Sequence, residues 1–239
     1  MFLAAPLVAQ SLLTALDVKI FVRYEHRLPQ DIPVVVVSNH RSFLDAAILL
    51  EAMPHPVRIA CHHYMGQTPI MREMVHLLGC FPLAEPGQRQ QQFTERANEL
   101  LTSQQWVGLF PEGTQPMVEP TEPQQVGKFQ RGFAHLALRV PRPNLAVLPV
   151  AIASLEETIY PTIPIRWLRW FDASEPMFDR RGLHPMLVYR RANVLIGRPY
   201  WINSEHRQQY RGKQARKVAT DLTEYCHQEI VELLSRGCY

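Results

Sequence analysis

Short runs of apolar residues alternate with amphipathic segments along the first two thirds of the chain. The clearest run, Pro33-Val-Val-Val-Val37, is β-branched and has no polar alternation, which is typical of a strand buried on both faces of a sheet. We expect further strands over residues 18–23, 57–61, 80–83, 106–110 and 146–151, and helices over 43–53, 70–78, 88–103 and within 127–140. This alternation predicts a single α/β domain with a central, mostly parallel mixed sheet flanked by helices.

The pattern changes after residue 151. Between residues 159 and 177, aromatic side chains (Trp167, Trp170) are interleaved with basic ones (Arg166, Arg169), a mixture that suits a membrane interface and equally suits a lid or a packed loop. One or two strands are expected over 187–196 and a terminal helix over 211–234.

The first sixteen residues carry no charged side chain. They lack the basic region of a signal peptide and are too short for a spanning helix, which needs about 20 apolar residues. Gln10, Thr14 and Asp17 would form one polar stripe on a helix. We therefore expect residues 1–17 to form an N-terminal helix that associates with a membrane interface, with residues 18–239 as the main domain. A helix packed on the domain's own core is the alternative.

Composition sets broad limits. The chain has 239 residues, 46% of them hydrophobic and 20% charged, which excludes disorder, collagen and coiled coil as descriptions of the whole chain. The formal net charge is +3, but residues 161–217 hold twelve Arg and Lys against four Asp and Glu. This basic block predicts one face that meets anions. We expect that partner to be an anionic membrane surface and not a nucleic acid.

Metal and cofactor chemistry has little support in the sequence. The four cysteines form no CxxC pair, which favours a reduced protein that faces the cytosol. The ten histidines include no HExxH motif, and Walker A, GxGxxG and GxSxG motifs are absent. We therefore expect no metal, no cofactor and no nucleophilic serine elbow.

The strongest chemical feature is Ser38-Asn-His-Arg-Ser-Phe-Leu-Asp45, which follows the buried valine run. Five residues rotate about 500° around a helix, so His40 and Asp45 would not share a helical face. They meet only if His40 lies in the strand-to-helix turn and Asp45 begins the helix. The carboxylate would then accept the Nδ1 proton of His40 and leave Nε2 free to take a proton.

Three further segments are candidates for the same site. Phe110-Pro-Glu-Gly-Thr114 follows another buried strand and would bring Glu112 and Gly113 to the same sheet edge. Lys128-Phe-Gln-Arg-Gly132 places two cations just before a helix, where they would favour a phosphate-bearing ligand. Pro149, within Val147-Leu-Pro-Val-Ala151, predicts a strand end or a bulge that forms a wall of the site.

Together the segments SNHRSFLD, GCFPLAE, FPEGT and VLPVAI resemble, in order and spacing, the PlsC-type glycerolipid acyltransferases, the 1-acylglycerol-3-phosphate acyltransferases. The resemblance covers roughly Ile20 to Arg198. It implies that a fatty acyl group moves from a thioester on acyl carrier protein or coenzyme A to a lysophospholipid hydroxyl. The expected acceptor is 1-acylglycerol-3-phosphate, the product phosphatidic acid, and the location the cytoplasmic face of a membrane, without a spanning helix.

The resemblance also implies roles for individual residues. His40 would be the general base, and Asp45 would orient it. The remaining candidates would bind substrate, and they are Arg41, Glu112, Gly113, Thr114, Arg131 and Pro149.

Two departures from the family pattern concern the acceptor. Gln115 stands where the family usually has arginine, and the block Phe81-Pro-Leu-Ala-Glu85 lacks its usual final arginine. A different acceptor without a phosphate, such as a glycolipid, a carotenoid or another alcohol, is therefore an alternative. A thioesterase, with water as acceptor, and a non-catalytic lipid-binding relative are further alternatives.

Overall fold

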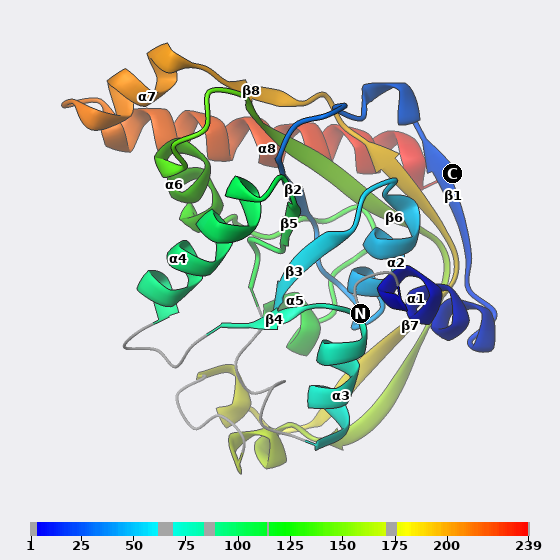
Figure 1. Ribbon diagram of the computed structural model, residues 1–239. Helices are drawn as coiled ribbons and strands as arrows, with labels where there is room; N and C mark the ends of the chain where they lie inside the picture. The colour runs from blue at the N-terminus through cyan, green and yellow to red at the C-terminus, as the bar shows by residue number, and fades with distance from the viewer. Residues whose placement is uncertain (1–3, 62–68, 84–88, 114, 171–175, 239) are drawn as a thin grey trace.

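The computed structural model describes residues 4–61, 69–83, 89–113, 115–170 and 176–238 (Figure 1). Within these ranges the strands form one mixed sheet in the order β1-β7-β6-β2-β5-β3-β4, and β8 pairs with β6. Strands β2, β3, β4 and β5 and the first part of β6 are parallel, whereas β7 and β8 run antiparallel to β6. The strands are β1 Lys19–Arg23, β2 Val34–Ser38, β3 Val57–Cys61, β4 Phe81–Pro82, β5 Trp106–Leu109, β6 Leu145–Pro164, β7 Leu183–Ile196 and β8 Tyr200–Ile202.

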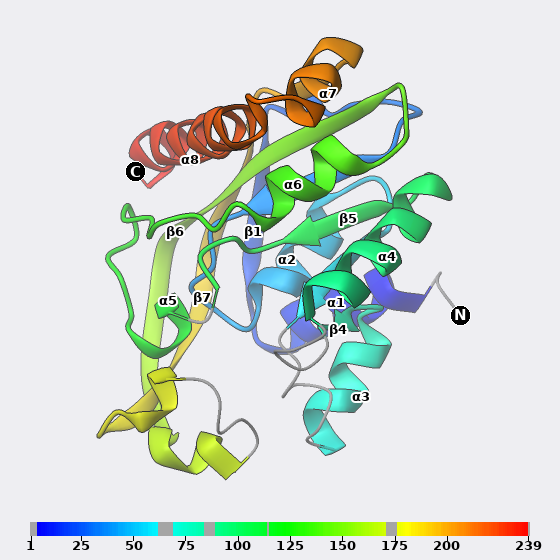
Figure 2. The same ribbon diagram turned by 90° about the vertical axis from the view of Figure 1, so that its left-hand side faces the viewer.

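Helices cover both faces of the sheet (Figures 1 and 2). The longer helices are α1 Ala4–Ala15, α2 Asp45–Ala52, α3 Pro69–Leu77, α4 Arg89–Thr102, α6 Gly132–Arg139, α7 Ser204–Arg211 and α8 Ala215–Gly237. Short helical turns are η1 Glu25–Arg27, α5 Gln115–Val118, η3 Ile165–Trp170 and η4 Pro176–Asp179. The predicted α/β class, with a mostly parallel central sheet, is confirmed.

The valine run explains why β2 is central. Val34 and Val36 pack on one face of the sheet, against a core that includes α1 and α2. Val35 and Val37 pack on the other face, against α4, α6 and α8. All four valines are fully buried. Because both faces are covered, the strand has no position for a polar residue until it reaches its carboxyl end.

Helix α1 packs on the domain itself. Ala5, Ala9 and Leu13, at helical spacing, are buried, and α1 contacts α2 and α3. The predicted polar stripe is on the outer face, where Gln10 and Thr14 are exposed. Part of the apolar face of α1 therefore belongs to the core, whereas Leu7 on the same helix is 63% exposed. Association of this helix with a membrane interface stays a prediction. In the described ranges we find no helix with the length and apolar character needed to cross a bilayer.

Strands β6 and β7 are longer than the sequence pattern predicted. β6 continues to Pro164, well past the expected end at Ala151, and β7 begins at Leu183. Beyond Ser154, β6 pairs with β7 and leaves the core, so this part of β6 carries the charged residues Glu156 and Glu157. The facing β7 residues Leu187, Val188 and Tyr189 stay buried. Because charged residues are typical of a loop, the sequence pattern predicted the end of β6 too early. The resulting β6–β7 arm, residues 155–186, extends from the sheet (Figures 1 and 2).

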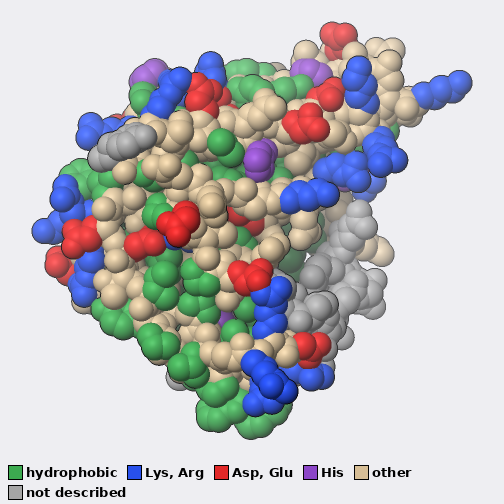
Figure 3. All heavy atoms as spheres, turned by 180° about the vertical axis from the view of Figure 1, so that it is seen from behind, with side chains coloured by type: hydrophobic (Ala, Val, Ile, Leu, Met, Phe, Trp, Pro, Cys, Tyr) green, Lys and Arg blue, Asp and Glu red, His purple; other side chains and the backbone are tan. Residues whose placement is uncertain are grey.

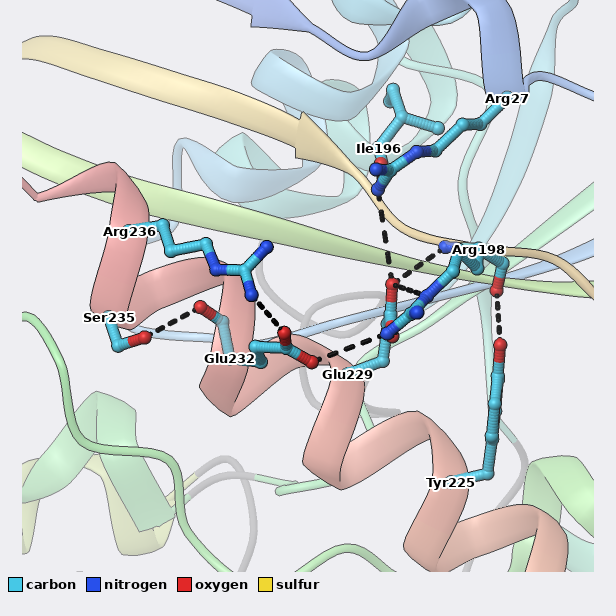
Figure 4. Close-up of polar contacts among 8 residues, drawn as sticks. All are labelled: Arg27, Ile196, Arg198, Tyr225, Glu229, Glu232, Ser235 and Arg236. Atoms are coloured by element: carbon cyan, nitrogen blue, oxygen red, sulfur yellow. Dashed lines mark hydrogen bonds and ion pairs between the residues drawn. The ribbon is translucent and has the colours of Figure 1, made fainter.

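The terminal helix is attached to the sheet by an ion-pair network (Figure 4). Glu229 on α8 is 5% exposed and accepts hydrogen bonds from the backbone N–H and the guanidinium of Arg198, at 2.8–3.2 Å. Burial alone would raise the pKa of Glu229, but these bonds and the charges of Arg198 and Arg27 bring it below its usual value. The terminal helix predicted over 211–234 is α8, and the shorter helix α7, which ends at Arg211, precedes it and was not predicted.

The basic block does not form one face, contrary to our prediction. Arg166, Arg169, Arg180 and Arg181 lie in the arm. The last residues of the block, from Arg211 to Lys217, lie around the junction of α7 and α8 at the opposite end of the molecule (Figures 1 and 3). Others already have partners in the fold, since Arg198, although exposed, pairs with Glu229, and Arg190 donates to the carbonyl of Leu16.

Candidate active site

The two residues of the HxxxxD motif meet in the strand-to-helix turn. His40 lies just after β2, and Asp45 is the first residue of α2. The Nδ1 atom of His40 is 2.9 Å from Oδ2 of Asp45. The side chain of Asp45 is fully buried, whereas that of His40 is 19% exposed. This is the geometry that the sequence predicted, with one partner fixed in the fold and the other reaching the surface.

Four donors hold the Asp45 carboxylate. Oδ2 accepts the backbone N–H of Arg41 at 2.7 Å and of Ser42 at 2.8 Å, in addition to His40. Oδ1 accepts the hydroxyl of Tyr189 at 2.9 Å. Because a carboxylate is only an acceptor, Nδ1 of His40 carries the proton in this pair. The other ring nitrogen, Nε2, is therefore an acceptor that is available to take a proton.

Two aromatic residues outside the predicted set support the dyad. Phe110 stacks on the ring of His40 at a centroid distance of 4.2 Å. Tyr189, from β7, is fully buried. Burial, together with the nearby Asp45 charge, raises the pKa of Tyr189 well above its usual value, so its hydroxyl keeps its proton and remains a donor. Phe110 is part of the FPEGT segment, but Tyr189 is 144 positions from Asp45 and no local motif marks it.

Glu112 is tied to backbone on both sides. Oε1 accepts the N–H of His40 at 3.0 Å, and Oε2 accepts the N–H of Gly127 at 2.5 Å. Burial raises the pKa of this carboxyl, and the two backbone donors oppose that rise. A Cβ on Gly127 would lie 2.9 Å from Oε2, so glycine permits the close approach. Glu112 thus joins the catalytic turn to the segment that begins at residue 127.

The remaining part of the FPEGT segment is only partly described. Gly113 has a φ of +75°, a left-handed conformation that favours glycine, and its N–H donates to the carbonyl of Phe110 at 3.2 Å. Thr114 lies outside the described residues. The structure therefore brings His40, Asp45, Glu112 and Gly113 together at one edge of the sheet.

The candidate arginines make other contacts. The guanidinium of Arg41 is buried, with two bonds to the carboxylate of Glu157 at 2.7 and 2.8 Å and others to the carbonyl of Thr121. Burial lowers the pKa of Arg41, but Glu157 more than compensates and raises it. Arg131 is exposed at the start of α6, where its Nη1 is 3.3 Å from the hydroxyl of Thr220 on α8.

Pro149 lies inside β6 and not at its end. It is in register with Val37, and its carbonyl accepts the N–H of Gly197 at 2.9 Å. On this side the partner of β6 changes, because β8 pairs with β6 up to Val147 and β7 begins to pair at Val150. The proline nitrogen, which has no hydrogen to donate, falls at this change of partner.

Among the residues that the structure describes, we find no group of three or more His, Cys, Asp or Glu side chains arranged to hold a metal ion. Nor do the side chains at the site supply an evident nucleophile. The hydroxyl of Ser42 is buried and donates to the carbonyl of Leu187 at 2.6 Å. Burial raises the pKa of the Cys61 thiol and raises that of Cys80 to about 12, which disfavours a reactive thiolate.

Comparisons with known proteins show similarity to acyltransferases. Residues 19–153 match the family model described as Acyltransferase. The chain is 30% identical over 200 residues to 1-acyl-sn-glycerol-3-phosphate acyltransferase alpha from Ovis aries, covering 76% of this chain and 66% of the relative. It is 30% identical over 135 residues to 1-acyl-sn-glycerol-3-phosphate acyltransferase from Pseudomonas aeruginosa, covering 54% and 49%. The chain spans about two thirds or less of the length of the curated relatives it matches.

A solved structure shows the same fold. The 1-acyl-sn-glycerophosphate acyltransferase PlsC from Thermotoga maritima matches with a TM-score of 0.60 and 16% identity, covering 97% of this chain and 77% of that one. The family model matches more than half of the chain and includes both His40 and Asp45. The chain therefore belongs to the acyltransferase family.

Proposed function

We propose that this protein is an O-acyltransferase that moves a fatty acyl group from a thioester to the hydroxyl of a lysophospholipid. The observation that carries the proposal is the His40–Asp45 pair, in which Asp45 fixes the Nδ1 proton and Nε2 is left as the acceptor. An imidazole oriented in this way is suited to general-base catalysis. The donor would be a thioester of acyl carrier protein or of coenzyme A.

The proposed reaction is a direct transfer. Nε2 of His40 takes the proton of the acceptor hydroxyl while the hydroxyl oxygen attacks the thioester carbonyl. When the tetrahedral intermediate collapses, the C–S bond breaks and the imidazolium returns the proton to the leaving thiolate. Asp45 stabilises the imidazolium through Nδ1. The engaged hydroxyl of Ser42 and the buried thiols support a route without an acyl-enzyme.

Within this mechanism Glu112 and Gly113 form the part of the site that follows β5. Because both carboxylate oxygens of Glu112 accept backbone N–H groups, we propose that Glu112 acts on the acceptor by positioning the segment 127–131. That segment carries Lys128 and Arg131, which are exposed. We propose that these cations meet the acceptor phosphate. Arg41 is a weaker candidate because Glu157 already neutralises it.

We propose 1-acylglycerol-3-phosphate as the acceptor and phosphatidic acid as the product, which agrees with the names of the relatives. An acceptor without a phosphate is the second candidate, favoured by one observation. Gln115, at the position of a family arginine, donates a hydrogen bond to Glu119, the residue after α5, at 3.3 Å, and a neutral amide offers no charged fork to a phosphate.

The test is a substrate screen with the purified full chain. Acyl-coenzyme A and acyl-carrier protein donors are each combined with lysophosphatidic acid, other lysophospholipids, a lysoglycolipid and water alone, and products are identified by mass spectrometry. We expect phosphatidic acid to be the main product. Release of free fatty acid without any acylated lipid would indicate a thioesterase, and a lack of turnover with every pair would support the non-catalytic lipid-binding alternative.

We also propose that the protein works as a peripheral protein on the cytoplasmic face of a membrane, where a lysophospholipid acceptor and its product reside. Sedimentation of the full chain with anionic vesicles tests this part of the proposal.

A further inference from the structure

The tip of the β6–β7 arm exposes large apolar side chains. We define the arm tip as residues 159–170 and 176–183. Trp167 is 52% exposed and Trp170 is 80% exposed, and their rings stack in parallel at a centroid distance of 6.1 Å. Four more apolar side chains of the tip, each at least 41% exposed, are Ile159, Tyr160, Ile163 and Leu183. Figure 3 shows hydrophobic side chains gathered at the lower end of the molecule, where the tip lies.

This exposure does not come from a lack of folded structure. The tip has a small core of its own, in which Ile165 and Phe178 are buried with Val118 of α5. The turns η3 and η4, which carry these residues, contact each other. The fold therefore separates two sets of apolar side chains in one short segment. One set fills the small core of the tip. The tryptophans lie on the outside, where their exposure to water is unfavourable and favours burial against an apolar partner.

The tip is joined to the catalytic turn through the base of the arm. Arg41, next to the catalytic histidine, makes its two bonds to Glu157 of β6, and Ser42 donates to the carbonyl of Leu187 of β7. Ile159 follows Glu157 by two residues, about 7 Å along a strand. Val150 is in register with Ser38, the last residue of β2. The later part of β6 therefore runs past the sheet edge that holds His40, toward the tip.

Charge around the tip is mixed. Four arginines (Arg166, Arg169, Arg180 and Arg181) are exposed, but Arg169 pairs with Asp179 at 2.8 Å and Arg180 pairs with Glu119. Tryptophan and arginine together are the side chains that favour the boundary between headgroups and acyl chains. With half of its arginines paired, the tip would gain more from burying apolar surface than from attraction to anionic lipid.

We propose that the arm tip is the surface that docks this protein on a lipid bilayer, with Trp167 and Trp170 inserted at the headgroup level. This rests on the proposed function for its purpose, since docking would bring the catalytic edge of the sheet to lysophospholipid in the membrane. The stacked tryptophans, their outward placement and their connection to the catalytic turn carry the proposal.

The test compares matched tryptophan variants of the full chain in vesicle flotation. Trp167→Ala with Trp170→Ala should lower the partition coefficient on phosphatidylcholine vesicles by about tenfold for each tryptophan. Trp201→Ala is the control, because Trp201 is 54% exposed but lies on β8, away from the arm. It should bind as wild type does. Equal binding by the double variant and wild type would overturn the proposal.

A second pair of variants separates the charge contribution. Arg166→Gln with Arg181→Gln should leave binding to phosphatidylcholine vesicles nearly unchanged. On vesicles that also contain phosphatidylglycerol it should weaken binding by about fivefold for each arginine, and added salt should remove that difference. Docking by apolar insertion would be contradicted if this variant lost binding to both vesicle types while the double tryptophan variant bound as wild type does.

A fluorescence measurement needs no change in the arm. Brominated phosphatidylcholine should quench the tryptophan emission of the Trp201→Ala protein, in which Trp106, Trp167 and Trp170 remain. Trp106 is buried, so the quenched signal reports the tip. Absence of quenching in protein that is bound to vesicles would show that another surface docks.

Failure of docking can be told apart from failure of the proposed function. With a short-chain thioester and a water-soluble short-chain acceptor, the double tryptophan variant should keep wild-type turnover, while its turnover on vesicles falls with its binding. If wild type transfers no acyl group, either to the soluble acceptor or on vesicles, the proposed function fails. The flotation result still decides whether the tip docks on a bilayer. If the double variant changes the oligomeric state and binds vesicles normally, the tip is a protein interface and the docking proposal is wrong.

Discussion

Tyr189→Phe removes one hydroxyl and tests how the catalytic carboxylate is held. Tyr189 donates to Oδ1 of Asp45 at 2.9 Å, and both side chains are fully buried. The variant leaves Oδ1 without this partner at a fully buried position. A hydrogen bond to a charged group contributes about 1.5–3 kcal/mol. If this hydrogen bond holds Asp45 where it stabilises the imidazolium, its loss lowers kcat by about 10- to 100-fold.

The assay is steady-state acyl transfer with donor and acceptor varied separately. Because Tyr189 acts through Asp45, we expect kcat to fall while the KM of each substrate stays near the wild-type value. In an Asp45→Asn background the same change should have little further effect on kcat. Tyr200→Phe is the control, since its hydroxyl is 3.1 Å from Nε2 of His206, away from the site. Wild-type kcat in a folded Tyr189→Phe enzyme would refute the reasoning.

Three other changes test other parts of the structure. Glu112→Gln places an amide against two backbone N–H donors, so it should lower the free energy of unfolding by about 1–3 kcal/mol and reduce kcat; unchanged denaturation and turnover would contradict the bridging role. Arg131→Ala should raise the KM for lysophosphatidic acid by about tenfold or more, with the donor KM unchanged; a silent variant together with poor use of that lipid would favour an acceptor without a phosphate. Glu229→Gln should destabilise the protein at neutral pH in urea titrations, because the pKa of Glu229 is lowered in the fold. Its contribution is present above the unfolded value of about 4.3 and is lost as pH falls through the folded value. If the difference in the free energy of unfolding between Glu229→Gln and wild type grew as the pH fell, the prediction would be contradicted.

The local part of the site could be predicted from the sequence. The valine run, the turn and the start of α2 are contiguous, and the five-residue spacing allowed His40 and Asp45 to meet in one arrangement only. The FPEGT segment was also placed correctly beside them, although Glu112 is 72 positions from His40, because it follows a second buried strand and β5 lies next to β2 in the sheet.

The supporting residues could not be predicted because they come from distant segments. Tyr189 reaches Asp45 across 144 positions, and Glu157 reaches Arg41 across 116. Glu157 belongs to the β6–β7 arm, where β6 leaves the core and carries charged residues. Tyr189 lies on β7 just past the arm and is fully buried in the core. The basic block was misjudged for a related reason. A stretch that is continuous in sequence runs from the arm to α8, so its charges are spread over opposite ends of the molecule.

The central claim is that His40 acts as the general base of acyl transfer. The most direct measurement is the turnover of purified His40→Ala with acyl-coenzyme A and lysophosphatidic acid, in protein whose thermal unfolding matches wild type. The side chain makes its polar contact with Asp45 and is partly exposed, so the fold should survive. We predict that kcat falls by about 10²–10⁴-fold. Turnover near the wild-type rate by folded His40→Ala protein would contradict the account.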